Sequence, residues 1–155
     1  MSDWTSCLVS DDTGLTRIFT TARTVAVLGA KAGDDQPAFY VPAYLAARGY
    51  RILPVNPTLA GSLFGVPVVP TLADLAEPVD VIDVFRRPEF LPEHAREILS
   101  LPWRPAAVWF QLGIRHDGAA EILARAGMLV VQDRCMMPEH RRLIGGQRGE
   151  SSQIA

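Results

Sequence analysis

The stretch TVAVLGAKAGDDQPAFYV, residues 24–41, decides the fold class. An apolar run ends at Gly29, and a helix-like segment with a proline in its first turn follows. A strand, a glycine turn and a helix in this order begin many dinucleotide-binding α/β folds, where the turn and the helix N-terminus hold phosphate. Here Lys31 stands where a second glycine is expected, and Asp34 and Asp35 follow it. The stretch therefore predicts a strand–turn–helix unit and leaves phosphate binding at the turn open.

Further short apolar runs, rich in β-branched residues, alternate with helix-like segments along the rest of the chain. This alternation is typical of βα units around a parallel sheet. Right-handed crossovers then predict an α/β fold with one open, doubly wound, mostly parallel sheet of five or six strands and helices on both faces. Ligands of such folds bind at the carboxyl ends of the strands. The predicted strands are residues 24–29, 51–56, 79–85, 106–113 and 128–133, with a short extra strand at 65–69.

The segments between these strands carry the start and stop signals of helices. Thr71 and Asp74 resemble a capping box that begins a brief helix. Asp117 is expected to cap the helix that Gly127 ends. Longer helices are predicted at residues 11–22, 38–49, 88–100 and 118–127.

Length and composition limit the classes of protein and partner. The chain has 155 residues, of which 48% are hydrophobic and 21% charged, which fits one soluble domain over residues 1–143 and a Gly- and Ser-rich flexible tail over 144–155. No apolar run is long enough for a membrane span, and the N-terminal residues lack a secretory pattern, so a cytoplasmic location is expected. A net charge of -2 makes nucleic acid and anionic membranes poor partners and leaves a small-molecule ligand as the expected one.

The end of the second predicted strand argues against NAD. An NAD site needs an Asp or Glu about 20 residues beyond the glycine turn, to bind the ribose hydroxyls. The strand ends in LPVNP, and no carboxylate lies between Asp35 and Asp74. One alternative stays open, an NADP-dependent oxidoreductase in which Arg51 or Arg86 binds the 2′-phosphate.

The next two strand ends carry groups suited to an anion and to an amide-containing ligand. Arg86 and Arg87 follow the third strand, and guanidinium groups bind phosphate bidentately. Gln111 and Gly113 at the fourth strand end offer an amide and a close backbone approach. Asp83 lies inside the third strand, where a carboxylate is costly unless it is hydrogen-bonded, so we expect it to accept from loop N–H groups or to pair with an arginine.

No set of residues predicts catalysis or a metal site. Cys135 follows the last strand, and His116 or His140 would be its candidate base. Their spacing supports no triad, and a buried structural thiol is the favoured interpretation. The three histidines and the nearby cysteine also lack metal-ligand spacing. The chain is therefore not expected to be an enzyme.

Taken together, the strand ends resemble a known family. VAVLGAKAGDDQPAFYVPAYLAARGYRILPVNP, PVDVIDVFRRPE, WFQLGI and VVQDRCMMPEHRRL resemble, in this order, the small stand-alone CoA-binding proteins, over roughly residues 16–143. These proteins are similar to the Rossmann-type CoA-binding domain of the succinyl-CoA synthetase α subunit. The resemblance implies a Rossmann-like domain that binds coenzyme A or an acyl-CoA as a non-catalytic binding or regulatory module, with a homodimer or a partner enzyme as its candidate assembly.

The same resemblance implies roles for the strand ends. The turn after the first strand would face the pyrophosphate, the second strand end the adenosine, the third the nucleotide or phosphates, and the fourth the pantetheine. The chain departs from the family pattern in the first turn, where relatives usually have a serine in place of Lys31. The implied cofactor-binding residues are Gly29, Ala30, Lys31, Val55, Asn56, Pro57, Phe85, Arg86, Gln111 and Gly113.

A last alternative comes from the acidic pair in the first turn. Asp34 and Asp35 would repel a phosphate if they pointed at it. The chain would then be a partner-binding domain whose nucleotide site has lapsed. The orientation of these two carboxylates decides between a working site and a lapsed one.

Overall fold

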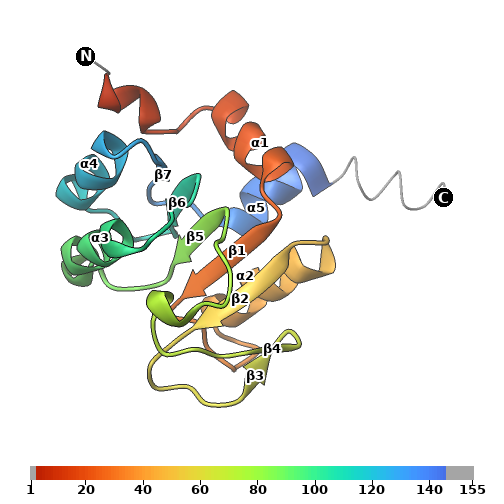
Figure 1. Cartoon of the computed structure of the whole chain (residues 1–155). Coiled ribbons are helices and arrows are strands. Elements are labelled where there is room, and N and C mark those ends of the chain that lie inside the picture. Colours follow the sequence, from red (N-terminus) through yellow and green to blue (C-terminus); the bar gives the residue numbers. More distant parts are fainter. Residues whose placement is uncertain (1–2, 146–155) are drawn as a thin grey trace.

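Five parallel strands form the central sheet of the computed structural model, which describes residues 3–145 (Figure 1). Their order is β2-β1-β5-β6-β7, and every pairing in the sheet is parallel. The winding direction reverses between β1 and β5, which makes their carboxyl ends the switch point of the sheet. The predicted doubly wound α/β fold is confirmed. The strands are β1 (Thr24–Leu28), β2 (Arg51–Val55), β5 (Val81–Val84), β6 (Ala107–Phe110) and β7 (Leu129–Val131).

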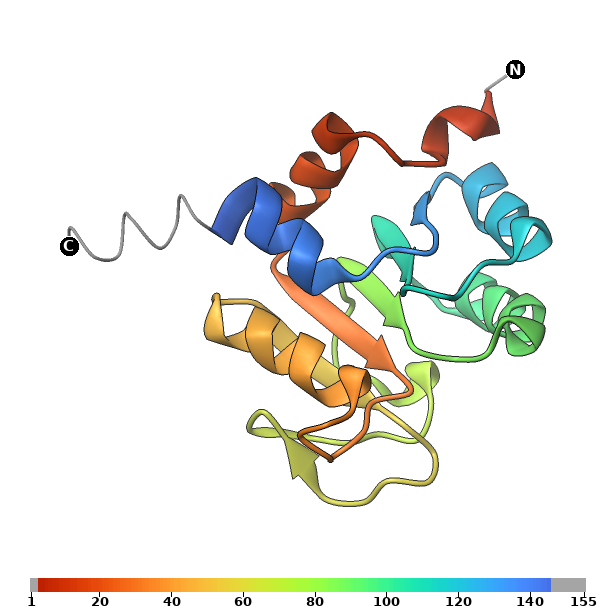
Figure 2. The same cartoon turned by 180° about the vertical axis from the view of Figure 1, so that it is seen from behind.

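Helices cover both faces of this sheet because successive strand residues point to opposite sides. Val25 and Val27 of β1 pack in one buried cluster with α1, α2 and α5, whereas Ala26 and Leu28 pack in the other with α3 and α4. Figure 2 shows α2 and α5 in front of the sheet and α3 and α4 beyond its opposite face. The helices are α1 (Asp12–Thr21), α2 (Pro37–Ala47), α3 (Leu91–Ser100), α4 (Asp117–Arg125) and α5 (Met136–His140).

Short elements connect the main ones. The predicted extra strand at 65–69 is present as β4, which pairs with β3 in a small antiparallel hairpin, and Val69 just beyond it forms a parallel bridge with Val55 of β2. The predicted capping box of Thr71 and Asp74 begins η2. The chain stays helical through Gly145, and the remainder of the expected tail, 146–155, lies outside the described residues. These elements are β3 (Ser62–Leu63), β4 (Val66–Pro67), and the short helices η1 (Trp4–Cys7), η2 (Leu72–Asp74), η3 (Pro88–Phe90) and η4 (Arg141–Gly145).

The predicted cap of α4 is wrong by one residue. His116 is the N-cap, with extended backbone angles, and its Nδ1 accepts from the backbone N–H of Ala119 at 3.0 Å. Asp117 is the first helical residue, and its carboxylate instead pairs with Arg115 and accepts from Gln132. His116 can serve as the N-cap because the unprotonated nitrogen of its ring accepts a hydrogen bond from a backbone N–H, as the oxygen of a short polar side chain would.

Gly29 allows the turn after β1 to pass directly against the end of β5. Its φ is +94°, and a Cβ there would lie 2.7 Å from the carbonyl oxygen of Phe85 and 3.3 Å from Cδ of Arg86. Its backbone N–H donates to the carbonyl oxygen of Val55 at 2.9 Å. The ends of β1, β2 and β5 therefore meet at this residue.

Asp83 is fully buried in the middle of β5, in register with Val27 of β1 and Trp109 of β6. Its Oδ1 accepts from Nε2 of Gln111 at 2.6 Å, and its Oδ2 has no hydrogen-bond partner within residues 3–145. The expected loop N–H groups and arginine are thus replaced by one side-chain amide. Burial raises the pKa of Asp83 to about 8, although the hydrogen bond from Gln111 acts in the opposite direction. The carboxyl group is therefore mostly protonated at neutral pH.

We expect the replacement of Gly29 by alanine to destabilise the protein more than the same change at Gly61. Both residues have φ near +90°, but nothing lies within 4 Å of a Cβ at Gly61. Gly61→Ala should cost about 1–2 kcal/mol for the left-handed backbone. Gly29→Ala should cost about 1–3 kcal/mol more, because the new Cβ meets a backbone carbonyl. Urea unfolding of both variants measures the difference, and equal losses would contradict the close approach.

We expect the stability difference between Asp83→Asn and the wild type to grow with pH. The native state keeps a proton on Asp83 up to about pH 8, whereas the unfolded chain loses it near the ordinary value of 3.8. Wild-type stability therefore falls as pH rises through this window, and the asparagine variant has no such proton to lose. The difference should increase by about 1.4 kcal/mol per pH unit between these values and then level off. Urea unfolding at several pH values measures it. Asp83→Leu should show the same slope, and a constant difference across pH would contradict the raised pKa.

Candidate functional site

A cavity of about 490 Å³ opens at the carboxyl ends of β1, β5, β6 and β7. It lies at the switch point between β1 and β5, where ligands of open α/β sheets bind. Each contributing segment follows directly on a strand or begins the next helix, so the sheet itself sets their positions. The lining residues are Lys31, Gln36, Pro37, Ala38, Tyr40, Phe85, Arg86, Arg87, Pro88, Gln111, Leu112, Gly113, Ile114 and Cys135.

One end of the cavity carries only positive charge. Lys31, Arg86 and Arg87 line it, and no Asp or Glu of the described residues does. The N-terminus of α2, with Pro37 in its first turn, also faces it and adds the positive end of a helix dipole. Cations at a helix N-terminus, without a competing carboxylate, form a site for an anion such as a phosphate.

Arg86 is held in place by a chain of contacts that the sequence analysis missed. Its Nε donates to Nε2 of His94 at 3.3 Å, and Nδ1 of His94 lies 2.9 Å from Oε1 of Glu97. With Nε2 as the acceptor, Nδ1 is the ring nitrogen that donates to Glu97. The guanidinium also lies 5.1 Å from the ring centroid of Phe90, where a cation is attracted to the aromatic face.

Glu97 is the last residue in this series of contacts from Arg86 through His94. The hydrogen bond from His94 is the main cause that lowers the pKa of Glu97, so the carboxylate is ionised. Its Oε2 also accepts from the backbone N–H of Leu72 at 3.3 Å. The sequence offered one signal for these contacts: a histidine and a glutamate lie three residues apart on α3, the helix that follows the two arginines.

The other end of the cavity is uncharged. Gln111, Leu112, Gly113 and Ile114 follow β6 there, and Cys135 follows β7. Gly113 has φ +83°, and its N–H donates to Oδ1 of Asp133 at 2.7 Å. This hydrogen bond joins the segment after β6 to the segment after β7. A neutral, partly apolar segment of a ligand fits this end better than a charged one.

Cys135 does not have the properties of a nucleophile. Burial raises the pKa of its thiol, so the thiolate is disfavoured at neutral pH. The two histidines considered as its base have other contacts: Nδ1 of His116 caps α4, and Nδ1 of His140 lies 3.0 Å from the hydroxyl of Tyr44. Within residues 3–145, no group of three or more His, Cys, Asp or Glu side chains could hold a metal ion.

The structure divides the predicted site residues into two groups. The first lines the cavity, and the second ties the strand ends together behind it. The carbonyl oxygen of Val55 accepts from the N–H groups of Gly29 and Ala30, and Nδ2 of Asn56 donates to the carbonyl oxygen of Ala30 at 2.7 Å. These amides are therefore used inside the protein. Lining the cavity are Lys31, Phe85, Arg86, Gln111 and Gly113, whereas Gly29, Ala30, Val55, Asn56 and Pro57 do not line it.

The acidic pair of the first turn is absent from the lining of the cavity. Asp34 and Asp35 are exposed and do not line it, whereas Lys31, three residues earlier, does. Direct contact with an anion in the cavity is therefore open to Lys31 and not to these two carboxylates.

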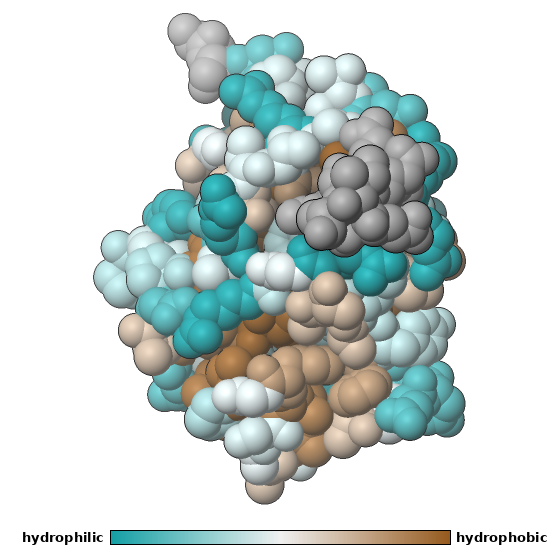
Figure 3. All heavy atoms as spheres, turned by 90° about the vertical axis from the view of Figure 1, so that its right-hand side faces the viewer, coloured by the Kyte–Doolittle hydropathy of each residue, from teal (hydrophilic) through white to brown (hydrophobic). Residues whose placement is uncertain are grey.

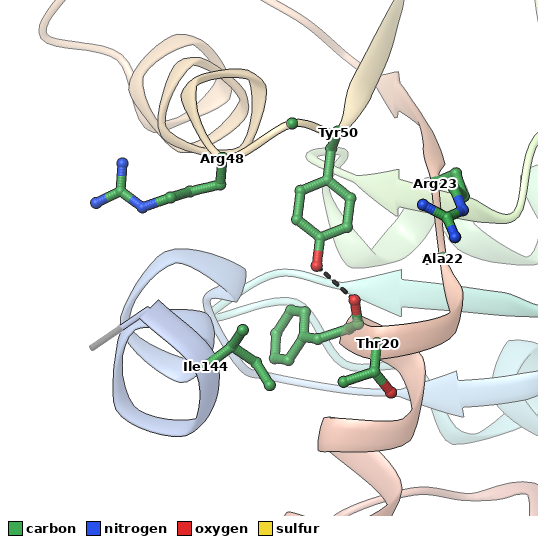
Figure 4. A pocket seen from close by; sticks show the side chains of 8 residues that line it. Thr20, Ala22, Arg23, Arg48, Tyr50 and Ile144 are labelled. Atoms are coloured by element: carbon green, nitrogen blue, oxygen red, sulfur yellow. Dashed lines mark hydrogen bonds between the residues drawn. The ribbon is translucent and has the colours of Figure 1, made fainter. Parts of the chain in front are cut away.

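A second cavity, of about 330 Å³, lies at the opposite, amino-terminal edge of β1 and β2 (Figure 4). The hydroxyl of Tyr50 donates to the carbonyl oxygen of Phe19 at 2.6 Å across its floor. The guanidinium groups of Arg23 and Arg48 lie on opposite sides of it and do not converge. This edge also holds Arg51, the first residue of β2, whose Nε pairs with Glu77 at 2.9 Å. Arg51 is thus far from the carboxyl edge at which an NADP phosphate would bind.

Helix α2 contributes to an unusually apolar surface. It has no charged residue between Pro37 and Ala47, and Phe39 stacks on Phe64 beside the β3–β4 hairpin with ring centroids 5.3 Å apart. Figure 3 shows apolar side chains gathered on the lower half of this side of the molecule. In the described part of the chain, no helix has the length and apolar character needed to cross a membrane.

Comparison with known proteins identifies relatives of the same size. A Bacillus subtilis protein, the uncharacterized protein YneT, is 34% identical over 119 residues, which are 77% of this chain and 86% of that protein. A solved Thermus thermophilus structure, cell-free ID.343, is 50% identical with a TM-score of 0.82 and covers 87% of this chain and 100% of its own. A hypothetical protein from Pyrococcus horikoshii OT3 is 31% identical with a TM-score of 0.81 and covers 88% of this chain and 94% of its own.

The family model described as CoA binding domain matches residues 23–141. This match covers every strand of the main sheet and every residue that lines the cavity at their carboxyl ends. The resemblance seen in the strand ends is therefore confirmed, and the chain belongs to the family of CoA-binding domains.

Proposed function

We propose that this protein binds coenzyme A or an acyl-CoA in the cavity at the carboxyl ends of the strands. The single observation that supports the proposal is the division of the cavity into a cationic end without carboxylates and an uncharged end with an amide side chain. Coenzyme A has the same division, because its phosphates are joined to a neutral pantetheine chain. Membership of the CoA-binding domain family supports the same ligand.

The charges favour one orientation of this ligand. The phosphates would contact Lys31, Arg86 and Arg87 at the N-terminus of α2, where charge-assisted hydrogen bonds are strongest. The pantetheine would pass Gln111 and Gly113 and lead its thiol or acyl end toward Cys135. A neighbouring cavity of about 390 Å³ also contains Cys135, so a long ligand has room to continue along the strand ends.

We further propose that the protein is a binding or regulatory module and not an enzyme. The Cys135 thiol has a raised pKa, and the cavity is lined by no histidine and no carboxylate of the described residues that could serve as a base. A module of this kind acts through another protein or by holding its ligand. A cytoplasmic location and a homodimer or partner enzyme belong to the same proposal, and the apolar surface of α2 supports an assembly.

We expect coenzyme A to raise the melting temperature, whereas NAD and NADP should not. A ligand that binds only the folded state stabilises it by RT ln(1 + [L]/Kd), so the shift should grow with ligand concentration. Thermal shift with each ligand over a range up to about millimolar concentration covers the affinities of weak and strong sites. A shift with NADP and none with coenzyme A would overturn the proposal.

We expect Arg86→Ala to weaken coenzyme A binding by about 1.5–3 kcal/mol, or about 10- to 150-fold in Kd, the range for a hydrogen bond to a charged group. Arg86 lines the cavity and is preorganised by His94 and Phe90, so its loss removes a fixed phosphate contact. Arg17→Ala is the matched control, because Arg17 lies on α1 and does not line the cavity. Isothermal titration calorimetry measures both variants. Equal affinity of Arg86→Ala and wild type would remove Arg86 from the site.

A further inference from the structure

Gln111 lies between the cavity and the buried carboxyl group of Asp83. It follows β6 directly, lines the cavity, and is 3% exposed. Its Nε2 donates to Oδ1 of Asp83 at 2.6 Å. Its Oε1 has no hydrogen-bond partner within residues 3–145 and is not among the fully buried polar atoms. The amide therefore turns its donor inward and leaves its acceptor accessible from the cavity.

Asp83 makes no other hydrogen bond in the described part of the chain. Val27 and Trp109 are its neighbours in the sheet, and its Oδ2 is buried without a partner. Burying such a group costs stability, and an apolar side chain of the same size would avoid this cost. The sheet around Asp83 is otherwise apolar, so packing does not explain a carboxyl group at this position. What the carboxyl group does is hold one amide in one orientation.

From this arrangement we propose that Asp83 is a positioning residue for ligand recognition. By accepting from Nε2 of Gln111, it fixes Oε1 as a hydrogen-bond acceptor for an amide N–H of the bound ligand. The proposal rests on the proposed function, because the amide N–H groups of coenzyme A belong to its pantetheine part. Asp83 then contributes to specificity for a pantetheine-containing ligand over the nucleotide alone, although it touches neither.

The hydrogen bond from Nε2 to Oδ1 of Asp83 selects one of the two orientations of the amide. A free Gln side chain can turn its carbonyl or its NH₂ toward a ligand, since the two ends are similar in size. A fixed acceptor discriminates more strongly, because a bound ligand without a matching donor covers this oxygen and leaves it unpaired. Removal of Asp83 would free the amide to rotate and would also leave Nε2 without its partner.

The test compares two ligands and four proteins. Coenzyme A and adenosine 3′,5′-bisphosphate, which lacks pantetheine, are titrated by calorimetry into the wild type, Asp83→Leu, Gln111→Leu and the double variant. We expect Asp83→Leu to weaken coenzyme A by about tenfold, the loss of a typical hydrogen bond in a buried site, and to leave the bisphosphate within about twofold. Because Asp83 acts through Gln111, the double variant should bind coenzyme A as weakly as Gln111→Leu and no more weakly.

The conservative variant Asp83→Asn keeps an acceptor oxygen at this position and removes the ionisable group. Its Oδ1 can still accept from Gln111, so coenzyme A affinity should stay within about threefold of the wild type. If Asp83→Leu does not unfold cooperatively, Asp83→Val replaces it, since valine suits a buried strand. Thermal unfolding of each variant is measured alongside binding.

Several outcomes would overturn the inference. Asp83→Leu could bind coenzyme A as the wild type does, could lose both ligands equally, or could add a further loss in the Gln111→Leu background. A wild type that binds both ligands with the same affinity would also refute it while leaving CoA binding intact. A wild type that binds neither would refute the proposed function itself, so the two failures are distinguishable.

Discussion

The close approach of the turn after β1 to the end of β5 is the constraint on which the site depends. No Cβ fits at Gly29, because it would lie 2.7 Å from the carbonyl oxygen of Phe85 and 3.3 Å from Cδ of Arg86. The same turn gives its N–H groups to Val55, so it is fixed from both neighbouring strands. Arg86 and the N-terminus of α2 consequently line the same cavity. The glycine is required to bring a cation and a helix end together, and this juxtaposition makes one end of the cavity cationic.

At this edge of the sheet, positively charged side chains line the cavity and the carboxylates of the described residues lie outside its lining. Lys31 lines the cavity, whereas the acidic pair that follows it is exposed and does not line it. Glu97 also stays outside the cavity, but it acts on it through His94 and Arg86. A carboxylate one side chain removed from the site orients a cation without neutralising the field at the ligand position. This explains how a protein with a net charge of -2 can present a locally cationic cavity.

Much of the fold followed from the sequence, because alternating apolar runs and helix signals are local properties. All five main strands and helices α1 to α4 lie where periodicity predicts them, and one helix cap moved, from Asp117 to His116. Helix α5 after the last strand was not predicted, because its five residues are too few to show a helical period. The site was less predictable. The cations at the strand ends could be named, since topology places strand ends together. The hydrogen bonds that Val55 and Asn56 make with the first turn could not be predicted from the sequence. A backbone carbonyl and a side-chain amide bind a neighbouring loop as readily as they bind a ligand.

Asp83 shows most clearly what local pattern cannot supply. Its position in an apolar strand predicted that its burial would cost stability. The raised pKa of its carboxyl group reflects the same unfavourable burial of the charged form. Its partner Gln111, however, lies 28 positions away, just beyond the end of the adjacent strand, and neither residue indicates the other without the register of β5 and β6. Proteins retain such destabilising groups where the group serves function and the rest of the core can bear the loss. The large apolar clusters on both faces of this sheet provide that margin, so a buried carboxyl group can be kept for the orientation of a single amide.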